Sequence, residues 1–328
     1  MIEQVYEKIY RCEIPLPENP LKVLNSYIIK GKDKAVIIDT GFNSNKCKEA
    51  FYHNLNRLDI DIRKTEVIVT HLHADHSGLA HELYRQGAKV FMSKGDGNTT
   101  KKMKEEKYWI EIGLQLKSFG LKVGEDFFDT HPGKIYAPSE EFDFTPLKEG
   151  STVVVDEYRF QVISVPGHTP DMINLYEPKH EVYFSADHVL DPITPNIAFW
   201  GFEYPLILNQ YFQSLKKIYS LKIKLMLPSH RKLIMDHKKR IDELLVHHQH
   251  RLQEIETILA QNKGDMTVEG VAKEMEWKIL AKDWDAFPPP QKSFAVAEAM
   301  SHLEYLAHKE RVHMSEKNGL VYFRIMEY

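Results

Sequence analysis

Four side chains that commonly bind metal ions lie within six residues of this chain, in the run HLHADH at 71–76. The run follows a short β-branched segment, 66–70, which predicts a strand. In an extended loop, residues two apart point the same way, so His71 and His73 can bind one ion together while Asp75 and His76 face a neighbouring position. Imidazoles combined with a carboxylate suit zinc. The sequence therefore predicts a metal site at the end of this strand.

The elements predicted around this run follow the order strand, loop, helix and strand, which indicates an α/β fold. A hairpin is predicted at 26–39, with its turn at 31–34, and a helix at 79–86 and a strand at 89–92 follow the histidine run. Binding sites of layered α/β folds often lie at the carboxyl ends of strands. The polar loop after the strand has this position.

Residues 95–150 interrupt the pattern and are predicted to be an insertion. A charged amphipathic segment at 101–119 predicts a helix, and 129–144 has no clear period and contains Pro132, Gly133 and Pro138. We expect a long loop there, and such loops in compact domains are more often functional than idle.

Three later candidate ligands each follow a predicted strand, as His71 does. His168 lies in the run PGHTP, Asp187 in SADH and His230 in PSH. Each of these residues alone could be an ordinary loop residue. Four strand ends that meet at one edge of a sheet would form a site, so we expect the four loops to converge.

The order HLHADH, GH, AD and SH resembles the metallo-β-lactamase superfamily, in particular its hydrolase branch of glyoxalase II, thioesterases and lactonases. The resemblance covers residues 1–238 and implies a four-layer αββα sandwich with the site at one edge. It also implies that two divalent metal ions are bound, most simply Zn²⁺, with iron or manganese as alternatives. By resemblance, the ligands are His71, His73 and His168 for the first ion, Asp75, His76 and His230 for the second, and Asp187 bridging both. Asp39, in the run IDTG, matches a position that supports the metal loop by hydrogen bonding.

These ligands predict a metal-dependent hydrolase in which a hydroxide shared by both ions attacks the carbonyl of a small ester, thioester or lactone. The predicted catalytic residues are Asp75 and Asp187. Asp187 would bridge the two ions, and Asp75 could also take or return a proton beside the attacking water. Phe199 and Trp200 could line an acyl pocket or simply pack in the core. Arg231 stands where a glycine often occurs and could bind a substrate carboxylate or phosphate, or be a surface residue.

A second unit is predicted at 239–328, where the composition changes. Helical segments at 238–261, 265–277 and 294–309 and a hairpin with Asn318-Gly319 at its turn have the outline of a small winged-helix-like domain. The third segment, 294–309, contains few basic residues, which disfavours contact with phosphate. We expect a packing role, either over the site or in a homodimer. The cluster His247, His248 and His250 is interpreted as a solvated helix face.

Composition narrows the partners. The formal net charge is −4, from 43 Lys and Arg against 47 Asp and Glu, so a broadly basic nucleic-acid surface is not indicated. No apolar run approaches the ~18 residues of a membrane span, and the first residues lack an apolar signal core. With only two cysteines, Cys12 and Cys47, a cytoplasmic location is the expectation.

A small-molecule acyl substrate is the favoured partner. The alternatives are a metal-dependent ribonuclease or phosphodiesterase, a ligand-sensing DNA-binding regulator, and a single-iron sulfur dioxygenase that would share most of the ligands.

Overall fold

The computed structural model describes residues 1–262 and 264–326, and within these residues the strands form three sheets. The first sheet contains, in spatial order, β1 (Ile2–Tyr6), β2 (Ile9–Pro15), β3 (Val23–Lys30), β4 (Ala35–Ile38), β5 (Thr65–Ile68), β6 (Lys89–Ser93) and β7 (Thr145–Leu147). The second contains β12 (Leu225–Pro228), β11 (Val182–Ala186), β10 (Ile173–Glu177), β9 (Tyr158–Ser164) and β8 (Thr152–Val155). The third is the small sheet β13 (Met266–Thr267), β15 (Leu320–Ile325) and β14 (Val312–Lys317).

The two large sheets pack face to face. One apolar cluster joins side chains of both, for example Ile29 and Ile68 of the first sheet with Phe160, Leu175 and Leu227 of the second. Alternate residues of β9 are buried, as expected for a strand with one face against the core. In contrast, β4 is buried on both faces because helices cover its other side.

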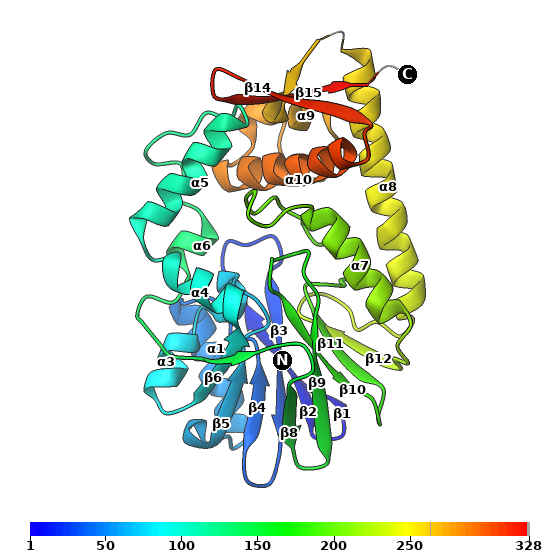
Figure 1. The fold of residues 1–328 in the computed structure, drawn as a ribbon. Coiled ribbons are helices and arrows are strands. Elements are labelled where there is room, and N and C mark those ends of the chain that lie inside the picture. The colour runs from blue at the N-terminus through cyan, green and yellow to red at the C-terminus, as the bar shows by residue number, and fades with distance from the viewer. Residues whose placement is uncertain (263, 327–328) are drawn as a thin grey trace.

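Helices cover the outer faces of both sheets and complete four layers (Figure 1). The first sheet is covered by α1 (Asn45–Arg57), α2 (Ala74–Ser77) and α3 (Ala80–Arg85), which share a second apolar cluster with it. The second sheet is covered by α7 (Ile207–Tyr219), whose Tyr211 and Leu215 share a third cluster with Tyr183 and Met226. The predicted α/β fold with helices outside two sheets is confirmed.

The insertion lies along one side of the molecule. It contains α4 (Lys94–Lys102), α5 (Glu106–Ser118) and α6 (Pro132–Ile135). The helix predicted at 101–119 is confirmed over Glu106–Ser118 and is wrong at its start, because the chain turns at Met103, whose carbonyl oxygen accepts a hydrogen bond from the indole of Trp109 at 2.7 Å.

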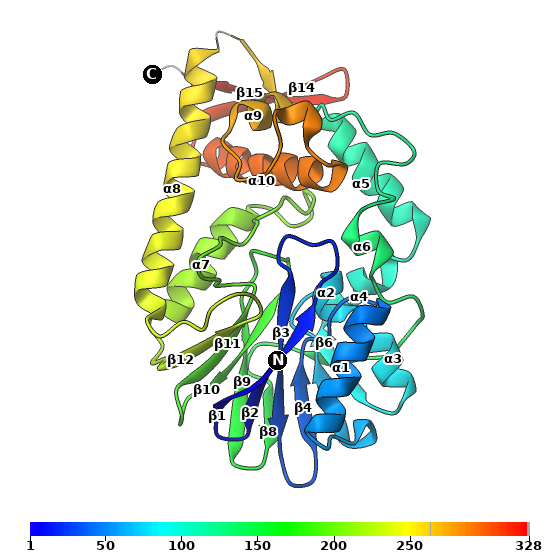
Figure 2. The same ribbon diagram turned by 180° about the vertical axis from the view of Figure 1, so that it is seen from behind.

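The C-terminal unit lies above the sheets, and α8 (His237–Gln261) runs along the side of the molecule up to it in both views (Figure 2). The unit also contains α9 (Val268–Glu274) and α10 (Pro289–His308), with α10 between the terminal hairpin and the loops of the large sheets. The hairpin predicted around Asn318-Gly319 is confirmed: Lys317 pairs with Leu320, and both turn residues have positive φ. The winged-helix interpretation of this unit stays a prediction.

The topology gathers several strand ends at one edge. In the first sheet β4, β5 and β6 are parallel, and in the second β9, β11 and β12 are parallel to one another. The loops that follow their carboxyl ends hold the polar residues singled out by the sequence. Among the helices that the described residues form, none combines the length and apolar character needed to cross a membrane.

Candidate metal centre

The loop after β5 begins the site. His73 precedes the single-turn helix α2, and its carbonyl oxygen accepts hydrogen bonds from the backbone N–H groups of His76 and Ser77. The chain bends at His71 and Leu72 and is helical from Ala74. Asp75 and His76 then join His230 in a neighbouring group, as the sequence pattern predicts, and the ring of His76 stays 3.9 Å from that of His71.

The first group of candidate ligands is His71, His73 and His168. Nε2 of His71 lies 3.1 Å from Nδ1 of His73, and Nε2 of His168 lies 3.0 Å from the same Nδ1. Burial and the neighbouring imidazoles lower the pKa of all three, that of His73 to about 3. Three neutral imidazoles with nitrogen atoms that face one point are a suitable donor set for a divalent cation.

The second group is Asp75, His76 and His230. Oδ2 of Asp75 lies 3.3 Å from Nε2 of His230 and 3.7 Å from Nε2 of His76. Burial works against ionisation of Asp75, but the two imidazoles outweigh it and lower the pKa of this carboxyl to about 2. Asp75 is therefore a carboxylate at neutral pH.

Asp187 lies between the groups. Its Oδ2 is 3.5 Å from Nε2 of His76 and 3.7 Å from Nε2 of His168, while its Oδ1 is 3.5 Å from Nε2 of His230. Burial raises the pKa of this carboxyl, and the surrounding histidines outweigh that effect and hold it well below its usual range. A carboxylate that reaches both groups is the arrangement that a bridging ligand requires.

Unpartnered atoms test whether these residues fit metal ions. Among the described residues, Nε2 of His76, Nε2 of His230 and Oδ1 of Asp187 are buried without a hydrogen-bond partner. Buried polar atoms normally have partners, because an unsatisfied one costs about 1–3 kcal/mol. All three point into the cluster, so the residues present fit a pair of cations.

The other nitrogen of several imidazoles is held by the protein. Nδ1 of His76 lies 2.7 Å from Oδ2 of Asp39, Nδ1 of His168 lies 2.8 Å from the carbonyl oxygen of Asn196, and Nδ1 of His230 lies 2.8 Å from that of Val23. These contacts fix each ring with its Nε2 toward the cluster.

Asp39, which follows β4, joins three loops. It is fully buried, and its carboxylate accepts hydrogen bonds from the backbone and hydroxyl of Thr70 and from the hydroxyl of Ser229, besides its contact with His76. Because Thr70 precedes His71 and Ser229 precedes His230, one side chain orients both groups of ligands.

Sequence reasoning missed a second buried carboxylate, Asp96, which follows β6. Its oxygens accept hydrogen bonds from the backbone N–H of Leu72 and the hydroxyl of Thr169, and from the backbone N–H of Asp171. Asp171 in turn accepts a hydrogen bond from the N–H of Gly95 at the start of α4. Asp96 thus ties the loop of His71 to the loop of His168, and its position directly after a strand was the signal that could have found it.

The three residues predicted to contact substrate, Phe199, Trp200 and Arg231, lie in different surroundings. The ring of Trp200 lies 5.8 Å from that of His73, and its indole donates to the carbonyl oxygen of His168 at 3.1 Å. Phe199 is only 4% exposed and packs against Phe119. Arg231 is exposed and donates to the carbonyl oxygen of Pro20. The structure brings only Trp200 beside the candidate ligands, and substrate contact by any of the three stays a prediction.

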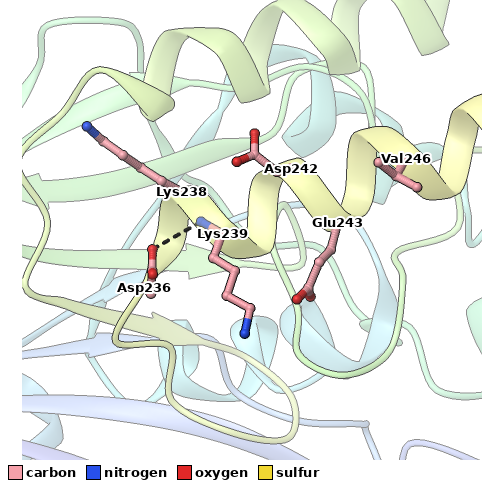
Figure 3. Close-up of a pocket in the computed structure, with 6 residues that line it drawn as sticks. All are labelled: Asp236, Lys238, Lys239, Asp242, Glu243 and Val246. Carbon is pink, nitrogen blue, oxygen red and sulfur yellow. Dashed lines mark hydrogen bonds between the residues drawn. The ribbon is translucent and has the colours of Figure 1, made fainter.

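A surface hollow lies elsewhere, on the first turns of α8 (Figure 3). Its lining residues all belong to one stretch of the chain and are Asp236, Lys238, Lys239, Asp242, Glu243 and Val246. Asp236 caps the helix by accepting from the N–H of Lys239. None of the candidate ligands is among these residues.

Comparison with known sequences agrees with the geometry. The family model described as Metallo-beta-lactamase superfamily matches residues 21–230. The chain is 25% identical over 267 residues to the Beta-lactamase-like protein 2 homolog of Caenorhabditis elegans, covering 80% of this chain and 74% of that protein. It is 26% identical over 164 residues to hydroxyacylglutathione hydrolase GloC of Haemophilus influenzae, covering 49% of this chain and 64% of that enzyme.

Two solved structures match nearly the full length. The metallo-beta-lactamase family protein TTHA1429 of Thermus thermophilus superposes with a TM-score of 0.82 at 25% identity, covering 98% of this chain and 100% of that chain. A beta-lactamase domain protein from Burkholderia ambifaria gives a TM-score of 0.81 at 23% identity, covering 99% and 95%, and this similarity shows the fold alone. Both matches extend through the C-terminal unit.

Proposed function

The chain belongs to the Metallo-beta-lactamase superfamily, whose members are generally metal-dependent hydrolases, and we propose that it cleaves a small ester, thioester or lactone with two divalent metal ions, most simply Zn²⁺. The observation that carries the proposal is the convergence of both ligand groups on Asp187. The name of the similar hydroxyacylglutathione hydrolase supports the substrate class, because an acyl group bound to the sulfur of glutathione is a thioester.

The ions, when bound, would lower the pKa of a shared water toward neutrality and polarise the carbonyl of the substrate. His71, His73 and His168 would hold one ion, and Asp75, His76 and His230 the other, with Asp187 shared. Because burial lowers the pKa of these first three imidazoles, their neutral, metal-binding form is favoured.

Asp75 is the residue proposed to move protons. Its carboxylate would accept the proton of the attacking water as the new carbon–oxygen bond forms, and would return it to the departing alkoxide or thiolate as the acyl bond breaks. The products would then be a carboxylic acid and an alcohol or thiol, so a separate nucleophilic serine or cysteine is not required.

Trp200 is proposed to border the acyl group, because it is the predicted substrate contact that lies beside a ligand, His73. Its indole N–H is already bonded to His168, so the apolar face of the ring is what it offers a substrate.

The test is turnover by chain that has been loaded with two zinc ions, across panels of acyl thioesters, lactones and aryl esters. We expect hydrolysis in at least one panel and a loss of about 100-fold or more in His73→Ala, which removes a ligand. No turnover in any panel would refute the substrate class. Cleavage of single-stranded RNA that disappears in His73→Ala would favour the ribonuclease alternative instead.

A further inference from the structure

The C-terminal unit contacts the segment that supports His168. This segment, residues 196–200, runs from the carbonyl oxygen bonded to His168 to the indole of Trp200 beside His73. It therefore touches the candidate metal centre at two points.

Helix α10 holds the same segment on its other side. The backbone N–H of Phe199 donates to the carbonyl oxygen of Ala297 at 2.9 Å, and the hydroxyl of Ser301 donates to the carbonyl oxygen of Ile197. The side-chain amide of Asn196 donates to Oε2 of Glu298 at 2.5 Å. The same amide donates to the carbonyl oxygen of Phe294 at 3.4 Å, so Glu298 is the closer of the two α10 partners of the residue bonded to His168.

Glu298 is itself fixed in place. It is only 8% exposed, and its Oε1 lies 3.9 Å from Nε of Arg251 on α8. Arg251 stacks on Trp277 at 4.3 Å and donates to the carbonyl oxygen of Glu276. Burial raises the pKa of this carboxyl to about 7, and one of its oxygens accepts from Asn196 with or without the proton.

We propose that Glu298 is a positioning residue for the metal ligand His168, acting through Asn196, so that the C-terminal unit completes the metal centre. The inference rests on the proposed function only in assuming that His168 binds a metal ion. Hydrogen-bonded partners of this kind orient a ligand imidazole, and their loss typically lowers metal affinity by about 10–100-fold.

The experiment measures zinc affinity of the full chain by competition with a chelator, together with the visible spectrum of the Co²⁺-loaded protein. Glu298→Ala should weaken one of the two ions by about 10-fold or more and change the cobalt spectrum. Glu298→Gln keeps an oxygen that can accept from Asn196 and should restore most of the affinity. Asn196→Ala should match Glu298→Ala, and the double variant should lose no more than either one, because both break the same connection.

Glu304→Ala is the matched control. Glu304 lies on the same helix and accepts a hydrogen bond from the backbone N–H of Leu206. Among the described residues, it has no hydrogen bond to the segment 196–200. It should leave both zinc affinities and the cobalt spectrum as in the wild type. If the role of Glu298 were purely structural, Glu298→Ala and Glu304→Ala would both lower the stability of the chain, and the cobalt spectrum of both would match that of the wild type.

Wild-type affinities and spectrum in both Glu298→Ala and Asn196→Ala would overturn the inference. If Glu298→Ala does not fold, Asn196→Ala decides alone, since it leaves Glu298 beside Arg251. The readout requires no substrate, so a chain that binds two ions but cleaves nothing would refute the substrate proposal and not this one.

Discussion

At the scale of the residue, the site depends on which nitrogen of each imidazole the protein uses. His76, His168 and His230 all give Nδ1 to a protein oxygen and turn Nε2 inward, whereas His73 turns Nδ1 inward. The sequence pattern identifies the residue types and cannot show this choice. The choice of nitrogen is set by hydrogen bonds to oxygens of Asp39, Asn196 and Val23. These residues lie 28 to 207 positions away in the sequence from the histidines that they contact.

The shared carboxylate gives the first prediction. Asp187→Ala should weaken both ions, because Asp187 faces both groups, whereas Asp39→Ala should weaken metal retention less, because it removes only support. Metal content per chain after gel filtration, by elemental analysis, checks this. Equal metal content in the wild type and Asp187→Ala would contradict the bridging assignment.

Asp96 gives a prediction about stability. Asp96→Ala leaves the backbone N–H groups of Leu72 and Asp171 and the hydroxyl of Thr169 without this acceptor, which should cost about 1–3 kcal/mol in free energy of unfolding. Urea denaturation of the full chain measures it. The control Asp129→Ala, at an exposed ion pair with Lys134, should change stability by less than about 1 kcal/mol; equal effects would show that Asp96 ties nothing together.

At the scale of the element, local patterns predict regular structure well and fail where distant partners decide. The helix predicted at 238–261 is α8 almost to the residue, because its period and its cap at Asp236 are local. The helix predicted at 265–277 is wrong at both ends: Met266 and Thr267 pair with β15, and α9 stops at Glu274. Pairing with a strand some 55 residues further on leaves no local sequence signal.

The histidine cluster on α8 shows the same limit. His250 is exposed, as the solvated interpretation expects, but His248 is fully buried, and its Nδ1 lies 3.0 Å from Nε2 of His302 on α10. The solvated interpretation is therefore wrong for His248. Its partner is 54 residues away, so helical spacing could not reveal it.

This buried pair predicts acid sensitivity. Burial lowers the pKa of His302 to about 3, below the ordinary value of 6.5, so the unfolded chain takes up a proton that the folded chain refuses between these values. The contribution of His302 to the free energy of unfolding is therefore fully present above pH 6.5 and is lost as the pH falls toward 3, by about 2 kcal/mol at pH 5.

Urea denaturation at pH 7 and pH 5 checks this prediction. His302→Leu should lose about 2 kcal/mol less than the wild type between the two pH values, while His313→Leu, at an exposed position of β14, should behave like the wild type. An equal loss in the wild type and His302→Leu would contradict a neutral buried pair.

At the scale of the whole molecule, the C-terminal unit packs through α10 on the part of the chain that carries the candidate metal centre. Eleven of the twenty residues of this helix are buried, and it lies between the terminal hairpin and the loops of the metal edge (Figure 1). A recognition helix must be free to enter the major groove of DNA. The packing therefore favours support of the site over nucleic-acid binding.

The full chain should accordingly show no salt-sensitive binding to duplex DNA. Fluorescence anisotropy of a labelled duplex at low ionic strength measures this, where phosphate contacts are strongest. Binding that falls steeply with added salt would revive the regulator hypothesis and would require α10 to leave its place.

The edge of the sheets could be predicted because strand ends and ligand types are local features, and the structure brings the seven predicted ligands together there. The supports of the site could not be predicted in the same way. Glu298 and Asn196 lie 102 residues apart, in parts of the chain that the sequence assigns to different units.

If the site works as proposed, distant loops of the chain hold two divalent cations side by side. Anomalous diffraction from crystals of the zinc-loaded chain, recorded on both sides of the zinc edge, tests it most directly. We expect two peaks about 3.5–4 Å apart, one beside His71, His73 and His168 and the other beside Asp75, His76 and His230, with Asp187 between them. A single peak, or none among these residues, would contradict it.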